Sequence, residues 1–316
     1  MVTNTTTMIK RNSYLQQGYQ SKGSLWKYLP IPGFFIMVMA LSYAVIQYGQ
    51  IDVAALMGQE ISRKGANRFL FESLAQFALG LAVLLFWVRW IHRQSFSTLI
   101  SSRDRIDWSR VLFGFAVWGS MVLIGLLISF WFHGQDFIFV WKGSSFWWLL
   151  VISLTMIPLQ TSFEEVLFRG YMMQGLGRLF RNAWGPLVVT SVLFGLMHIG
   201  NPEVQKLGLL SLVYYISTGF FLGIITLIDE GLELAMGFHA ANNIFTAVLV
   251  TSTWTAFQTD ALFMDVSQPS LGAEVWLPVV IFFPITFWIF KRKYHWTNAW
   301  QKCTAPVVPP SDQSAQ

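Results

Sequence analysis

The chain has 316 residues, of which 54% are hydrophobic and only 12% are charged. Soluble domains typically carry about 25% charged residues, so this composition excludes an ordinary soluble domain and indicates a membrane protein. We expect no nucleic-acid partner despite the net charge of +5, because most basic residues flank apolar runs, where membrane topology accounts for them. The single cysteine, Cys303, excludes an intrachain disulfide and a cysteine-based metal cluster.

The first 30 residues are polar and basic, and the chain after them contains a series of apolar runs. The segment 1–30 lacks the apolar core and cleavage site of a signal peptide, so we expect it to lie in the cytoplasm. Each later run is close to the roughly 20 residues that a helix needs to span a bilayer. The expected helices are about 32–49, 69–91, 111–133, 146–168, 184–199, 207–228, 234–251 and 275–291. The run 184–199 is short and contains a histidine, so its sequence alone does not determine whether it spans fully.

These runs predict an all-α fold, a polytopic membrane bundle of about eight transmembrane helices. The chain divides into N-terminal transmembrane helices at 31–145, a core at 146–251, a loop and last transmembrane helix at 252–302, and a tail at 303–316. The tail is rich in Pro, Ser and Gln, and we expect it to be disordered. Gly219-Phe-Phe-Leu-Gly223 is a spacing of small residues that allows another helix to approach closely.

Basic residues predict the orientation of the bundle. If the N-terminus is cytoplasmic and eight spans alternate, 16 of the 21 basic residues fall on the cytoplasmic side. The positive-inside rule therefore places both termini in the cytoplasm, although Arg63, Lys64 and Arg68 oppose it. We expect an integral, multi-pass membrane protein, located in the plasma membrane if the source is bacterial.

The first of three polar motifs inside the core is Glu164-Glu165-Val-Leu-Phe-Arg169. Ionisable groups at bilayer depth are expensive and mark a functional site by default. Glu165 and Arg169 are four residues apart, so they share a helix face and can pair. Glu164 is rotated by about 100° from Glu165 and has no such partner, which leaves its carboxylate available as a general base for water. The alternative is a cluster of charges that only anchors the helix end at the membrane interface.

The second and third motifs are Phe194-Gly-Leu-Met-His198 and His239-Ala-Ala-Asn-Asn243. Phe194 lies one turn before His198, where it would form a wall of the site. His239 and Asn243 share a helix face, and both can donate hydrogen bonds to a developing oxyanion. The alternatives are an interfacial histidine and hydrogen bonds that only join helices.

Outside these motifs, we expect the remaining histidines, His92, His133 and His295, to lie at the membrane interface.

Together the three motifs, in this order and at this spacing, resemble those of the CPBP family of intramembrane proteases. This family is also called the CAAX-protease and bacteriocin-processing family, or the Abi family. It includes the eukaryotic endoprotease that trims the end of prenylated proteins after the prenylated cysteine. The resemblance covers roughly residues 146–250 and implies an endopeptidase whose partners are the lipid bilayer and a membrane-associated protein or peptide substrate.

The resemblance also implies a role for each motif residue. Glu164 and His198 would position and deprotonate the attacking water. His239 and Asn243 would stabilise the tetrahedral oxyanion. The acid–base pair of the first motif would hold the site together.

The cofactor and the class of function have alternatives at this stage. We expect no obligatory cofactor, because a His-Glu-xx-His pair on one helix, which would indicate zinc, is absent. If the site does hold zinc or another divalent metal, the ligands would be Glu164, His198 and His239. A proton-coupled or ion-coupled transporter would favour inverted repeats, whereas these polar residues gather in one half of the chain. A non-catalytic membrane scaffold or immunity protein that keeps the family fold is the other alternative.

Overall fold

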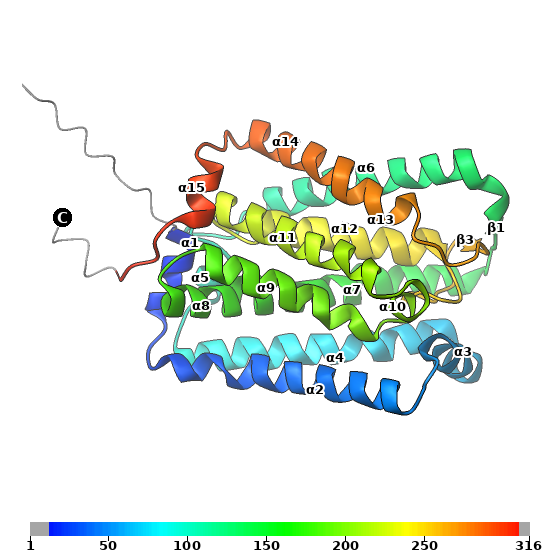
Figure 1. The fold of residues 1–316 in the computed structure, drawn as a ribbon, viewed down its shortest axis with the longest axis horizontal. Coiled ribbons are helices and arrows are strands. Elements are labelled where there is room, and N and C mark those ends of the chain that lie inside the picture. The colour runs from blue at the N-terminus through cyan, green and yellow to red at the C-terminus, as the bar shows by residue number, and fades with distance from the viewer. Residues whose placement is uncertain (1–12, 310–316) are drawn as a thin grey trace, which may run out of the picture.

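The computed structural model describes residues 13–309, and its main feature is a bundle of helices along the longest axis of the molecule (Figure 1). The bundle consists of α2 (Pro30–Tyr48), α4 (Ala66–Trp87), α6 (Trp108–His133), α7 (Ser144–Glu165), α8 (Met173–Phe180), α9 (Trp184–Leu196), α11 (Leu212–Asp229), α12 (Glu233–Leu249), α13 (Ala273–Leu277) and α14 (Phe283–Lys293). Shorter helices lie at its ends: α1 (Ser13–Gln16), α3 (Val53–Lys64), α5 (Phe96–Ile100), α10 (Pro202–Leu207) and α15 (Ala299–Thr304). The predicted all-α membrane bundle is confirmed.

Six helical segments among residues 13–309 are long and apolar enough to cross a membrane. They are Leu25–Tyr48, Ala66–His92, Trp108–Asp136, Ser144–Phe180, Leu209–Asp229 and Val275–Lys293. Each predicted run falls on a helix, but the count of about eight spans is not confirmed, because Trp184–Gly200 and the 17-residue α12 are shorter. The protein is an integral, multi-pass membrane protein.

The helix that carries the first motif extends beyond its predicted end at about residue 168. A π-helical turn, Val166–Met172, joins α7 to α8 without a break, and the helix ends at Phe180. Every residue of this π-helical turn is buried. The bundle interior therefore surrounds the segment, and the helical backbone satisfies its own hydrogen bonds there. A π-helical turn inserted in an α-helix is frequent at functional sites.

Close contact between α9 and α11 depends on glycine, as the spacing of Gly219 and Gly223 predicts. A Cβ atom added at Gly219 would lie 2.5 Å from the carbonyl oxygen of Ser191, and one at Gly223 would lie 2.5 Å from Leu187. Both distances are shorter than van der Waals contact; at Gly219 the obstacle is backbone, so only glycine permits this approach, whereas at Gly223 the Leu187 side chain would have to move. The packing holds α9, and the second motif at its end, against the centre of the bundle.

A buried cluster of charges fixes the start of α12. Arg103, in the loop after α5, places Nη2 2.7 Å from Asp229 Oδ2 and Nη1 3.0 Å from Glu233 Oε2. Arg110 on α6 also pairs with Asp229. Because Asp229 ends α11 and Glu233 begins α12, these pairs join the loop and α6 to the turn between the two helices.

A small sheet lies at the opposite end of the bundle (Figure 1). Its strands are β1 (Phe137–Phe139), β2 (Val250–Thr251) and β3 (Phe263–Asp265), in the order β1-β3-β2. β3 pairs antiparallel with β1 and parallel with β2. The sheet connects the chain segments that follow α6 and α12.

The prediction that residues 303–316 are disordered is wrong for 303–309, whereas 310–316 lie outside the described residues. Cys303 and Val307 are buried, and the amide of Val307 donates to the carbonyl oxygen of Arg181 at 3.0 Å. The apolar residues between the prolines pack against the bundle, which a prediction from Pro, Ser and Gln content did not take into account.

The prediction that His92 is interfacial is also wrong. His92 is fully buried, with Ser21 Oγ 2.5 Å from Nδ1 and the Tyr171 hydroxyl 2.8 Å from Nε2. Within the predicted cytoplasmic segment 1–30, residues 1–12 lie outside the described part, and the residues after them fold onto the bundle. Tyr14 is fully buried there, and its hydroxyl donates to the carbonyl oxygen of Leu99 at 2.8 Å.

We expect a reporter fused to the C-terminus to be located in the cytoplasm. The described chain begins at α1 and ends just after α15 at the same end of the bundle (Figure 1), and most basic residues are predicted to lie on that side. A reporter inserted beside Lys142, between β1 and α7, is the control and should lie on the other side. A C-terminal reporter outside the cytoplasm would refute this orientation.

The packed tail should protect the single cysteine from thiol reagents. Burial raises the pKa of the Cys303 thiol to about 11, so little reactive thiolate is present at pH 8. We expect modification of folded protein at pH 8 to be on the order of a hundredfold slower than that of a cysteine at exposed Thr304 in a Cys303→Ser/Thr304→Cys variant. The labelling rate should rise as the pH approaches 11. Equal rates for the two cysteines at pH 8 would show that the tail does not pack.

Candidate active site

The charges of the first motif are buried in the middle of the bundle. Glu164 is 3% exposed, and Glu165 and Arg169 are fully buried. Glu165 Oε1 and Arg169 Nη1 are 2.9 Å apart, which is the pairing that the four-residue spacing predicts. The guanidinium of Arg169 also contacts the carbonyl oxygen of Gly219, 3.3 Å from Nη2, and the ring of Phe194, 4.1 Å from the guanidinium carbon. The guanidinium therefore joins α7, α9 and α11.

Glu164 has two carboxylate oxygens in different surroundings. Gln160, one turn earlier on α7, donates from Nε2 to Glu164 Oε1 at 2.6 Å. Glu164 Oε2 accepts no hydrogen bond from the described residues and lies 3.6 Å from His239 Nε2. The sequence predicts no partner for Glu164. This prediction is wrong for Oε1, which Gln160 bonds, and holds for Oε2. The second oxygen is available to a ligand or a water molecule.

His239 links the two carboxylates. Its Nδ1 lies 2.7 Å from Glu165 Oε1, and its Nε2 faces Glu164. Glu165 is a buried carboxylate beside Arg169, so it accepts this bond and Nδ1 carries the proton. Glu165 therefore accepts from both the Arg169 guanidinium and the His239 imidazole. These bonds matter here because an unpaired buried charge is costly in a membrane protein.

A chain of amide hydrogen bonds runs from α6 to Glu164. Trp118 Nε1 donates to Asn242 Oδ1 at 3.1 Å, Asn242 Nδ2 donates to Asn243 Oδ1 at 3.1 Å, and Asn243 Nδ2 donates to Gln160 Oε1 at 3.0 Å. An indole can only donate and a carboxylate can only accept, so the two ends fix the direction of every amide in between. Asn243 has a second N–H that this chain does not use.

His198 lies in the 3₁₀ turn Met197–Gly200 that follows α9. Its Nδ1 is 2.9 Å from the carbonyl oxygen of Phe194, so Nδ1 carries a proton and Nε2 is the nitrogen left for other partners. The imidazole stacks on Tyr215 with ring centres 4.0 Å apart. Phe194 packs against both motif histidines, with its ring centre 5.2 Å from His198 and 5.8 Å from His239.

The structure thus brings Glu164, Glu165, Arg169, His239 and Asn243 into one bonded network. His198 adjoins this network through the Phe194 ring. Among the described residues it forms no hydrogen bond with a carboxylate.

Sequence reasoning missed several residues around the site. Gln160 bridges Glu164 and Asn243, and its spacing of four residues from Glu164 could have identified it. Tyr215 supports His198 and donates from its hydroxyl to Glu203 on α10. No local pattern predicts the Tyr215 contact, because it depends on the packing of α11 against α9.

The donor set does not form a metal centre in this geometry. No group of three or more His, Cys, Asp or Glu residues among the described positions converges as metal ligands would. Of the predicted ligands, Glu164 and His239 approach each other, with His239 Nε2 3.6 Å from Glu164 Oε2, and His198 does not complete a set of three with them. The catalytic roles proposed below therefore involve no metal.

Comparison with known proteins bears on the same part of the chain. Residues 143–245 match one family model, which is described as type II CAAX prenyl endopeptidase Rce1-like. The matched residues contain all three motifs. The match confirms the resemblance that the motifs predict and assigns this core to the CPBP, or CAAX protease, family. In general terms, this core is similar to that of CAAX-protease-like intramembrane endopeptidases.

One relative is similar to this chain over a longer stretch than the core. An uncharacterized protein of Bacillus subtilis (strain 168), YyaK, is 27% identical over 293 residues, which cover 89% of this chain and 97% of that protein. The similarity therefore includes the N-terminal helices, which carry none of the three motifs. No solved structure matches the chain.

We expect Arg169→Ala to reduce the stability of the protein as well as its activity. The substitution leaves Glu165 buried beside His239 without its guanidinium partner, and breaking a buried pair typically costs about 3–5 kcal/mol. The measurements are abundance in membranes and the thermal unfolding midpoint in detergent. Arg89→Ala removes an exposed arginine and is the control. Normal abundance and an unchanged midpoint for Arg169→Ala would contradict the structural role of the pair.

Proposed function

We propose that the protein hydrolyses a peptide bond of a membrane-associated protein or peptide, with water activated by Glu164 and His198. The observation that carries the proposal is the state of Glu164, buried at bilayer depth with one oxygen bonded by Gln160 and the other unbonded beside His239. A buried carboxylate with an open oxygen can accept a proton from water. The charges and amides around it are held in place before any substrate arrives.

Each residue then has a role that its bonds allow. Glu164 Oε2 takes a proton from the attacking water and later delivers it to the leaving amine, so the proton is returned. Nε2 of His198 accepts from the same water and orients it, because Nδ1 is held by the Phe194 carbonyl. The side chains of Gln160 and Tyr215 act indirectly, by fixing Glu164 and His198.

The oxyanion role of His239 requires the doubly protonated ring. Since Nδ1–H already donates to Glu165, only an imidazolium has a second N–H, on Nε2, for the developing oxyanion. With His239 positive, the charges of Glu164, Glu165 and Arg169 are balanced overall. The second N–H of Asn243 is the other proposed donor.

The substrate class follows from the location of the site. The catalytic groups lie within apolar helices, so the substrate has to enter from the bilayer or its surface. The matched family is described as a prenyl endopeptidase, whereas our proposal extends only to a membrane-associated protein or peptide. A scaffold needs no open carboxylate oxygen beside a histidine, and a proton-coupled transporter, which could use both, needs no amide donor aimed at the same point.

Replacing the proposed base should abolish turnover without unfolding the protein. We expect Glu164→Gln and His198→Ala to lose cleavage of a membrane-tethered reporter almost completely. Asn243→Ala should lose about 10²–10³ in turnover while substrate binding changes little, since it removes one oxyanion donor. The assay uses purified protein in detergent, with thermal midpoints to verify folding and Glu60→Gln, at a partly exposed position outside the site, as the matched control.

Two outcomes of this assay would overturn parts of the proposal. Full cleavage by Glu164→Gln would eliminate Glu164 as the base and favour the scaffold alternative or another carboxylate. Loss of wild-type activity with a chelator, restored by zinc, would replace water activation by Glu164 and His198 with metal-dependent hydrolysis and leave the protease class intact.

A further inference from the structure

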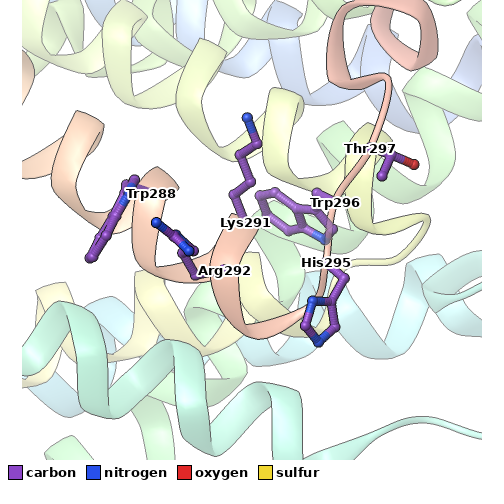
Figure 2. Close-up of a pocket in the computed structure, with 6 residues that line it drawn as sticks. All are labelled: Trp288, Lys291, Arg292, His295, Trp296 and Thr297. Atoms are coloured by element: carbon purple, nitrogen blue, oxygen red, sulfur yellow. The ribbon is translucent and has the colours of Figure 1, made fainter.

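A cavity of about 500 Å³ lies at the end of α14, away from the candidate active site (Figure 2). The residues that line it are Trp288, Lys291, Arg292, His295, Trp296 and Thr297. They belong to the last turns of α14 and to the segment between α14 and α15. This is the end of the bundle near which both ends of the described chain lie (Figure 1), and it is predicted to be cytoplasmic.

The lining of this cavity is basic and contains no acidic residue. Lys291 and Arg292 are exposed, and neither forms an ion pair with any residue in the described part of the chain. The Arg292 guanidinium carbon lies 5.5 Å from the centre of the Trp288 ring. A cluster of cations without carboxylate partners provides a site for an anion.

The carboxylate that bonds to the cavity lining, Asp229, is already paired with two arginines. Trp296, which is buried, donates from Nε1 to Asp229 Oδ1 at 3.0 Å, so its ring is fixed as one side of the cavity. Asp229 is in turn paired with Arg103 and Arg110. Its negative charge is therefore compensated and does not neutralise Lys291 or Arg292.

An exposed apolar face of α14 leads from the membrane into the cavity. Ile285, Trp288 and Arg292 are three and four residues apart, so they follow one face of the helix. Ile285 is 41% exposed and Trp288 is 57% exposed in the described structure. Val280 and Ile281, one turn further into the span, are exposed as well. Along this face, apolar side chains are followed by an interfacial tryptophan and then by cations. A phospholipid has the matching order, with acyl chains followed by an anionic headgroup.

We propose that this cavity binds the phosphate headgroup of an anionic phospholipid, whose acyl chains lie along the exposed face of α14. Lys291 and Arg292 contact the phosphate, and His295 and Thr297 supply further donors. The acyl chains pack on Ile285 and Trp288. The site is independent of the proposed catalytic function, since it shares no residue with the motif network.

The test uses the purified full-length chain in detergent, titrated with short-chain phosphatidylglycerol and, separately, phosphatidylcholine, and followed by its thermal midpoint. We expect saturable stabilisation by phosphatidylglycerol. In Lys291→Gln/Arg292→Gln the apparent affinity should fall roughly thirtyfold, because each cation near a lipid surface contributes a substantial share of the binding. The matched control is Arg89→Gln/Arg93→Gln, which removes two exposed arginines, one of them beside exposed Trp90, and should bind as the wild type does.

A second titration separates a lipid from a free anion. Inorganic phosphate alone should neither stabilise the protein saturably nor displace phosphatidylglycerol at matched ionic strength. Saturable binding of inorganic phosphate that Lys291→Gln/Arg292→Gln abolishes would overturn the lipid proposal and identify a soluble anion as the ligand. Equal loss of phosphatidylglycerol binding in the Arg89→Gln/Arg93→Gln control, or equal affinity for the two lipids, would show that the cavity is not a specific site.

Discussion

The contact on which the rest of this structure depends is the buried pair of Glu165 and Arg169. Neither charge is tolerated alone in the interior of a membrane protein, so each requires the other. Once formed, the pair orients its neighbours: Glu165 holds Nδ1 of His239, while Arg169 contacts Gly219 and the face of Phe194. Four helices, α7, α9, α11 and α12, are thereby located relative to one ion pair.

The amide chain complements this charged centre. Its direction is imposed by the indole of Trp118 at one end and the carboxylate of Glu164 at the other, so no amide in it can rotate without losing a bond. A network whose members are all bonded is rigid, and rigidity is what a site needs when it stabilises a transition state. Glu164 Oε2, at the end of this amide chain, accepts no hydrogen bond from the described residues.

Different interactions join the loops and helices at the two ends of the bundle. At the end that holds α3 and α10, a three-stranded sheet connects the loops. At the opposite end, Arg103 and Arg110 pair with Asp229, and the residues 303–309 pack against the bundle. The basic cavity beside α14 lies at this second end, where the charges of Asp229 are already compensated and leave Lys291 and Arg292 to an external anion.

The sequence by itself determined the membrane class, the helical fold and the motif pairs that belong to one helix. Glu165 with Arg169 could be predicted because a helix places residues four apart on the same face, and this geometry needs no knowledge of other helices. The close approach at Gly219 and Gly223 was predictable for the same reason. The tertiary structure alone decided that Glu165 bonds His239, that Asn243 bonds Gln160, that His198 stacks on Tyr215, and that His92 and Cys303 are buried. These contacts join segments far apart in the chain, and their geometry depends on how the helices pack.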